Sequence, residues 1–130
     1  MKKQLNAVHT FHETYKIPQN ESPVGEIPHE QYMLRYKLMR EENEEYLEAA
    51  ENSDTVEIAD ALGDMLYILC GTILSHGMQN VIEEVFDEIQ RSNMSKLGED
   101  GQPIYREDGK VMKGPNYFKP NLKSILEKYQ

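Results

Sequence analysis

Apolar residues recur at helical spacing along most of this chain and predict an all-α fold. The first expected helix is Lys3–Tyr15, where apolar side chains return about every 3.6 residues. Longer periodic segments follow at His29–Glu51 and Thr55–His76, and a clearly amphipathic one covers Asn80–Arg91. These segments together predict a bundle-like arrangement of helices.

Turn and loop residues separate the periodic segments. Three prolines lie within residues 17–28 and indicate an extended connection. The run Asn52-Ser53-Asp54 interrupts the helical pattern and offers Ser53 or Asp54 as a side-chain cap for the next helix.

The C-terminal part has a different character. Asp108-Gly109 is a turn signal, and the runs Ile104–Arg106 and Lys110–Met112 beside it could pair as a small hairpin. Leu122–Tyr129 could form a short closing helix. We therefore expect one all-α domain, residues 1–130, with four to five helices and an irregular C-terminal extension.

Composition narrows the class of protein. A hydrophobic content of 38% and a charged content of 28% are typical of a soluble globular protein. We see no apolar run near the roughly 20 residues that span a bilayer and no secretory signal, so we expect a cytoplasmic protein without a membrane partner. Cys70 is the only cysteine, which excludes an internal disulfide and a cysteine-based zinc site.

The charge is strongly acidic and unevenly distributed. A net charge of −9 argues against a nucleic-acid polymer as ligand, because phosphate backbones need a basic surface. Ten of the 23 acidic residues lie between Glu41 and Asp64. This segment is either a solvated surface or a site for cations, whose charge would let an anionic substrate approach.

Helical geometry sorts the acids of the second expected helix. At about 100° per residue, Glu42 and Glu45 continue the apolar stripe begun by Leu34 and Leu38, and Glu41 lies at its edge. Two others fall on or toward the solvated flank: Glu44 and Glu48.

The third expected helix carries a line of acids in an apolar setting. Glu57, Asp60 and Asp64 lie three and four residues apart, on one face of a helix that is apolar nearly all round and should be buried. Buried carboxylates need partners, and Arg35 is the only cation near the Glu42 line. A hard divalent cation, Mg²⁺ or Mn²⁺, would satisfy them; a charged helix pair with incidental spacing is the alternative.

This arrangement resembles the all-α NTP pyrophosphohydrolase superfamily, which includes MazG-like proteins, phosphoribosyl-ATP pyrophosphohydrolases and dimeric dUTPases. Its motif is Glu-Glu-x-x-Glu on one helix and Glu-x-x-Asp on the next. Glu41-Glu42-x-x-Glu45 matches the first part. For the second part, Glu57-Ile58-Ala59-Asp60 fits the spelling, whereas Asp64-Met65-Leu66-Tyr67 resembles the family's Asp-Leu-Leu-Tyr. Which two of the three acids bind metal stays open.

Further segments extend the resemblance over most of the chain. Ser92-Asn93-Met94-Ser95-Lys96 resembles a Ser-Asn-x-Ser-Lys element found in part of the superfamily. Phe11-His12 and the Gly-Lys-x-x-Lys-Gly-Pro run at Gly109–Pro115 resemble one branch of it. The combination is more specific than the glutamate motif alone.

The resemblance implies Mg²⁺-dependent cleavage of a nucleotide between its α- and β-phosphates, releasing a monophosphate and pyrophosphate. The implied catalytic residues are Glu41, Glu42 and Glu45. Glu41 would orient the attacking water or take its proton. The implied metal ligands are Glu42, Glu45, Glu57, Asp60 and Asp64.

The implied substrate contacts lie mainly in the C-terminal part. Asn93 and Lys96 would hold the phosphate tail, Lys110 and Lys113 would close over it, and Tyr67 could stack on the base. Each has a plainer interpretation as well: a helix cap for Asn93, solvated side chains for the lysines, and core packing for Tyr67.

Two other functions compete with this one. The substrate could be phosphoribosyl-ATP, or the chain could be a non-catalytic helical oligomerisation or adaptor module with a basic partner. Four modest helices leave the apolar ones under-covered, so we also expect a homodimer or a tetramer.

Overall fold

The computed structural model describes residues 1–130 and contains five helices and no strands, which confirms the predicted all-α class. Its helices are α1 (Lys2–Thr14), α2 (His29–Glu51), α3 (Thr55–Ser75), α4 (Ile82–Met94) and α5 (Leu122–Glu127). The chain forms two compact units, residues 1–80 and 81–130, and each is described by itself. The single domain expected from the sequence stays a prediction.

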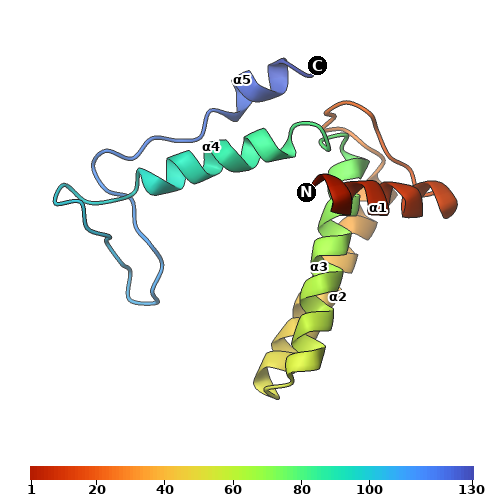
Figure 1. Ribbon diagram of the computed structural model, residues 1–130, viewed down its shortest axis with the longest axis horizontal. Helices are drawn as coiled ribbons and strands as arrows, with labels where there is room; N and C mark the ends of the chain where they lie inside the picture. Colours follow the sequence, from red (N-terminus) through yellow and green to blue (C-terminus); the bar gives the residue numbers. More distant parts are fainter. The chain divides into compact units, whose positions relative to one another are not determined.

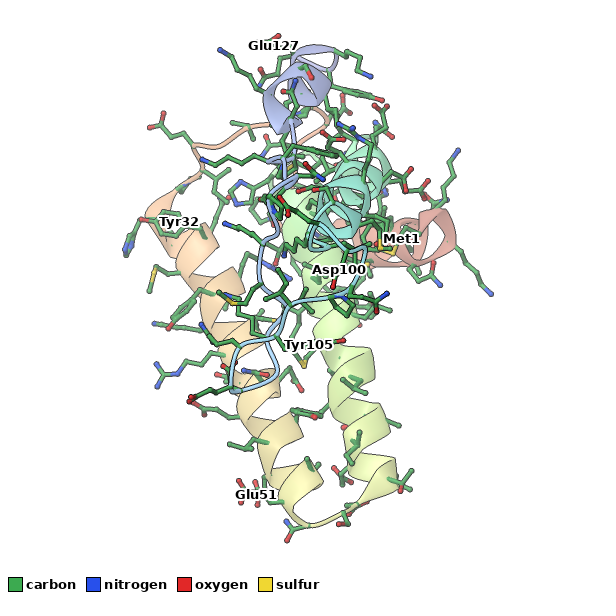
Figure 2. All side chains as sticks on the ribbon, turned by 90° about the vertical axis from the view of Figure 1, so that its left-hand side faces the viewer. Met1, Tyr32, Glu51, Asp100, Tyr105 and Glu127 are labelled. Atoms are coloured by element: carbon green, nitrogen blue, oxygen red, sulfur yellow. The ribbon has the colours of Figure 1, made fainter.

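The first unit is built on an antiparallel pair of long helices. α2 and α3 lie side by side, with Glu51 at the end of α2 next to the turn that joins them (Figures 1 and 2). Of the two caps predicted for α3, Asp54 is the observed one: its Oδ1 accepts a hydrogen bond from the Glu57 amide at 3.1 Å. Ser53 instead takes the left-handed conformation that reverses the chain, with φ of 50°.

The proline-containing connection, residues 17–28, is bonded to the end of α3. The Val24 amide donates to the His76 carbonyl at 2.9 Å. Gly77 ends the helix in the left-handed region, with φ of 65°, and a Cβ there would lie 2.0 Å from the Ser22 carbonyl oxygen. A glycine is therefore required both for the conformation and for the close approach of the connection.

The face of α2 that turns inward differs from the predicted one. Leu34, with which the predicted apolar stripe begins, is 50% exposed, whereas Arg35 is 8% exposed. The inward line passes through Arg35, the half-buried Glu42 and the buried Ala49. The prediction that Leu34 faces the core is wrong, because a buried guanidinium occupies the place expected of an apolar side chain.

Arg35 is held by neutral acceptors on α3. Its Nη2 donates to the Ile68 carbonyl at 3.0 Å and its Nε donates to Thr72 Oγ1 at 3.2 Å. The buried ring of His12, from α1, lies beside it. Burial and the charge of Arg35 lower the pKa of His12 to about 4, so the ring is neutral at physiological pH.

Gly71 makes room for this pair of side chains. A Cβ at this position would lie 2.4 Å from Arg35 Nη2 and 2.9 Å from His12 Nε2. The absence of a side chain on α3 therefore permits the guanidinium to reach the helix backbone.

α3 is less completely covered than its sequence suggests. Leu62, Leu66 and Leu69 are 52%, 42% and 45% exposed, so the prediction of burial nearly all round is wrong. By length and composition α3 could cross a membrane, with a mean hydropathy of 1.4 over 18 residues. The expectation that no segment comes near this limit was therefore wrong, although core helices pass the same test, and α3 packs on both α1 and α2.

In the second unit, α4 begins two residues later than predicted, at Ile82 instead of Asn80. It continues to Met94 instead of ending at Arg91, so Ser92 and Asn93 lie in its last turn and not after it. Serine and asparagine usually favour helix ends because their side chains compete for the backbone. Here the Ser92 hydroxyl donates to the Phe118 carbonyl at 2.8 Å, so it does not compete.

The remainder of the second unit is a hydrogen-bonded extension. The predicted hairpin is reduced to a single antiparallel bridge between Tyr105 and Val111. α5 ends at Glu127, two residues before its predicted end, and Lys128 Nζ forms an ion pair with Glu84 of α4 at 2.8 Å.

The Arg35–Gly71 contact gives a first prediction. Replacing Gly71 with Ala should destabilise the protein by about 1–3 kcal/mol, because the guanidinium or the α3 backbone must move. Gly63→Ala is the matched control on the same helix, since nothing lies within 4 Å of its Cβ position. It should be neutral or stabilising by up to about 1 kcal/mol. Chemical denaturation measures both, and equal effects would contradict this account of Gly71.

Candidate active site

The contact between Arg35 and α3 sets the axial register of the two acid-bearing helices. Arg35 bonds to the Ile68 carbonyl. Two turns further along α2 comes Glu42, and one and two turns back along α3 come Asp64 and Asp60. Because the helices are antiparallel, these acids face one another across the pair.

Glu42 is the electrostatic centre of this group. Its pKa rises from 4.5 to about 7, first through burial and then through the neighbouring carboxylates of Glu45, Asp64 and Asp60. Its Oε2 is buried and has no hydrogen-bond partner. A carboxylate oxygen in this position is costly unless it takes up a proton or a cation.

A polar hollow of about 480 Å³ lies between α2 and α3, toward the turn that joins them. It is lined by Glu45, Glu48, Ala49, Asn52, Asp54, Glu57 and Asp60. Glu48 was expected on or toward the solvated flank, and Asn52 was expected only in the interruption between the helices. Their spacing could have indicated them, because Glu45, Glu48 and Asn52 lie three and four residues apart on one face of α2.

The predicted inward direction of the acids is only partly observed. Glu42 and Asp64 are half-buried. The other members of the predicted set are exposed: Glu41, Glu45, Glu57 and Asp60. No three acidic, histidine or cysteine side chains converge closely enough to hold a metal ion as they stand. Repulsion between like charges favours the separation of these exposed carboxylates.

The donor set nevertheless suits a hard divalent cation. All the available ligands are carboxylate oxygens, which Mg²⁺ and Mn²⁺ prefer, and one of them is the unpartnered Glu42 Oε2. The charges of Asp60 and Asp64 both raise the pKa of Glu42, and Asp60 also lines the hollow, together with Glu57 nearer the turn. The three acids on α3 thus occupy different parts of the site.

The candidate phosphate-binding residues lie in the second unit. Asn93 and Lys96 line a hollow of about 380 Å³ that is mostly apolar. The Lys113 ammonium lies 4.9 Å from the centre of the Tyr117 ring. Lys96, Lys110 and Lys113 form no ion pair, whereas Arg91 in the same unit forms one with Glu88.

Tyr67 lies on α3 and contacts α1. Its ring meets Phe11 edge to face, with ring centres 5.4 Å apart, and Phe11 in turn packs on Tyr15 at 4.5 Å. Packing accounts for its position, while 40% of its surface remains exposed.

Comparison with known proteins adds independent information. A family model for phosphoribosyl-ATP pyrophosphohydrolase matches residues 8–93. A crystal structure from Exiguobacterium sp. 255-15, described as a "putative NTP pyrophosphohydrolase", shares 27% sequence identity over 96% of this chain and 94% of that one. Its TM-score of 0.49 does not by itself establish a common fold. A search of curated proteins found no significant match.

The matched segment covers more than half of the chain and includes both acid-bearing helices, α2 and α3, in full. The resemblance noted in the sequence is thereby confirmed. The chain belongs to the phosphoribosyl-ATP pyrophosphohydrolase family, within the all-α NTP pyrophosphohydrolase superfamily, and is a nucleotide pyrophosphohydrolase.

Proposed function

We propose that this enzyme hydrolyses a nucleoside triphosphate between its α- and β-phosphates, with Mg²⁺ as cofactor and Mn²⁺ as a substitute. The observation that carries the proposal is the half-buried Glu42 carboxylate, whose Oε2 has no partner and which faces Asp60 and Asp64. Family membership supplies the reaction class.

The acids of α2 and α3 would hold the cofactor. The proposed ligands are Glu42, Glu45, Glu57, Asp60 and Asp64. A divalent cation in such a site neutralises phosphate charge and lowers the pKa of a bound water. Glu41 is exposed and directly precedes Glu42 in the chain. We propose that it orients the attacking water and accepts its proton.

Residues outside the acid cluster would bind the substrate. Lys96, Lys110 and Lys113 form no ion pair with an acidic side chain, so their ammonium groups are available to an anionic ligand. We propose that these lysines, with the amide of Asn93, bind the phosphate oxygens. The exposed part of Tyr67 is proposed to contact the base.

Phosphoribosyl-ATP is the second candidate substrate. The name of the matching family model favours it, and the same acids and lysines would serve. The reaction would again release pyrophosphate.

A substrate panel tests the proposal. Purified protein loaded with Mg²⁺ should release pyrophosphate from at least one canonical or modified nucleoside triphosphate, and removal of Mg²⁺ by chelation should stop turnover. Phosphoribosyl-ATP is included to separate the two candidates. A folded, metal-loaded protein that turns over none of these compounds would contradict the proposed function.

Substitution of Glu42 or Glu45 by Gln should lower kcat/KM by about a hundredfold or more, because loss of even an outer-shell partner of a metal site costs about 10–100-fold. Glu44→Gln is the matched control, since Glu44 is exposed and bonded to Arg40 on the outer side of α2. Its activity should be unchanged. Steady-state pyrophosphate release measures all three, and equal losses in all three would argue against an inward metal site.

The raised pKa of Glu42 gives a pH prediction for the metal-free protein. With a pKa near 4.5 when unfolded and about 7 when folded, Glu42 holds its proton more tightly in the folded state. Its contribution to stability is full below about pH 4.5 and is lost as pH rises through 7. In EDTA, the melting temperature of the wild type should therefore fall between pH 5.5 and pH 8.

Glu42→Gln removes this titration. The variant should melt at a higher temperature than the wild type at pH 8, and its melting temperature should depend less on pH. Mg²⁺ should raise the melting temperature of the wild type more than that of the variant. Identical pH profiles for the two proteins would show that Glu42 does not carry the buried charge.

We further propose a cytoplasmic homodimer, or a tetramer built from dimers. Exposed apolar side chains on α3 (Leu62, Leu66 and Leu69) and Phe86 on α4, which is 68% exposed, support an interface between copies. Light scattering at micromolar concentration should give at least twice the monomer mass, and Leu66→Glu should reduce it. A wild-type protein that remains monomeric at high concentration would contradict this assembly.

A further inference from the structure

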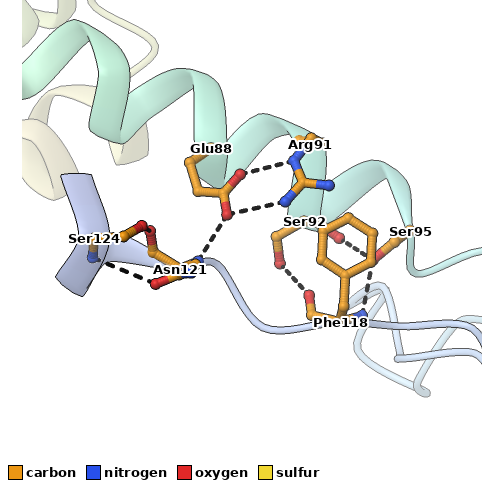
Figure 3. Close-up of polar contacts among 7 residues, drawn as sticks. All are labelled: Glu88, Arg91, Ser92, Ser95, Phe118, Asn121 and Ser124. Carbon is orange, nitrogen blue, oxygen red and sulfur yellow. Dashed lines mark hydrogen bonds and ion pairs between the residues drawn. The ribbon is translucent and has the colours of Figure 1, made fainter.

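Two serines of the Ser92-Asn93-Met94-Ser95-Lys96 segment are hydrogen-bonded to one residue of the C-terminal extension, Phe118. The Ser92 hydroxyl donates to the Phe118 carbonyl at 2.8 Å, and the Phe118 amide donates to Ser95 Oγ at 3.2 Å (Figure 3). The Ser95 hydroxyl in turn donates to the Ser92 carbonyl at 2.5 Å. Both polar groups of the Phe118 backbone are thus bonded to the last turn of α4 and the residue that follows it. We call this arrangement the serine bracket.

A second anchor lies a few residues earlier in the extension. The Gly114 amide donates to the Lys96 carbonyl at 2.8 Å. A Cβ on Gly114 would lie 1.9 Å from the Leu97 carbonyl oxygen, so the extension closely approaches the segment that follows α4 and only glycine fits there. The segment between Gly114 and Phe118 is therefore held at both ends.

These anchors place two lysines in one region of the second unit. Lys113 directly precedes Gly114, whose amide is bonded to the backbone of Lys96. The Lys113 side chain is directed over the Tyr117 ring, and Tyr117 belongs to the segment that the anchors hold. Both lysines lack an acidic partner, whereas Arg91 and Lys128 nearby are paired with Glu88 and Glu84.

The serines themselves are not free to bind a ligand. Ser92 is 1% exposed and its hydroxyl proton is used on Phe118. Ser95 Oγ both accepts from Phe118 and donates to Ser92. A direct contact between either hydroxyl and a phosphate would require these bonds to break. The two serines therefore hold the backbone of the extension, whereas Lys96 of the same segment remains available to a ligand.

We propose that Ser92 and Ser95 are positioning residues, which hold the 113–118 segment so that Lys96 and Lys113 bind the pyrophosphate part of the substrate together. The inference rests on the proposed function, because it takes these lysines as phosphate-binding residues. In this proposal the serines affect substrate binding only through the position of the lysines.

Single substitutions Ser92→Ala and Ser95→Ala test the proposal. Ser92→Ala removes one hydrogen bond and Ser95→Ala removes two, and we expect a roughly threefold to tenfold rise in KM and in the inhibition constant of added pyrophosphate for each. kcat should change less than KM, because the metal-binding acids are untouched. Hydrogen exchange at the Phe118 amide should accelerate in Ser95→Ala, and Ser95→Thr, which keeps the hydroxyl, should restore the wild-type values.

Ser124→Ala is the matched control. Ser124 lies in α5 of the same unit, is exposed, and its hydroxyl makes only a 3.4 Å bond to the Asn121 carbonyl (Figure 3). The substitution removes one serine hydroxyl and leaves the hydrogen bonds of the serine bracket intact. Its KM and its pyrophosphate inhibition constant should equal those of the wild type.

A double-mutant cycle decides whether the serines act through the lysine. Lys113→Ala alone should raise KM, and adding Ser95→Ala to it should raise KM little further, because the held side chain is already gone. Fully additive effects, or unchanged KM and inhibition constants in both serine variants, would overturn the inference while leaving the proposed function intact. Absence of turnover in the wild type would instead contradict the proposed function itself.

Discussion

The hydrogen bonds from the Arg35 guanidinium to the Ile68 carbonyl and the Thr72 hydroxyl of α3 are the constraint on which the site depends. A buried cation without bonds costs several kcal/mol, so its position along α3 is sharply determined. Gly71 provides the space, and the carbonyl of Ile68 provides the acceptor. With that register set, the periodicity of the two helices places Glu42 opposite Asp60 and Asp64.

The carboxylates that face one another across α2 and α3 lower the stability of the fold at the proposed active site. Facing carboxylates repel one another, and Glu42 responds with a pKa of about 7, so its ionised form is disfavoured in the folded protein. An apolar residue at this position would relieve the repulsion. A cluster that weakens the fold is expected where binding supplies the compensating energy, and that is the usual relation between an active site and its scaffold.

The sequence predicted the helices better than the directions of their side chains. The bounds of α2 were predicted in full, because apolar periodicity and the Asn52-Ser53-Asp54 interruption are local signals. The inward face was misjudged, since a hydrophobic stripe cannot reveal that Arg35 is buried and Leu34 is not. That outcome depends on Gly71, on another helix. Likewise, exposed acids such as Glu45 could not be told from buried ones by spacing alone.

The Ser-Asn-x-Ser-Lys segment shows the same limit at shorter range. In the sequence its polar residues look equivalent, and helix capping was the plain interpretation of Asn93. The structure distinguishes them through a residue 26 positions away, because Phe118 takes up the hydroxyl of Ser92. A motif of this kind combines groups that hold the chain with groups that remain available to a ligand. Lys96, which has no acidic partner and lines a hollow, belongs to the second kind. The residues of such a motif that can bind a ligand are therefore those whose polar groups have no partner within the protein.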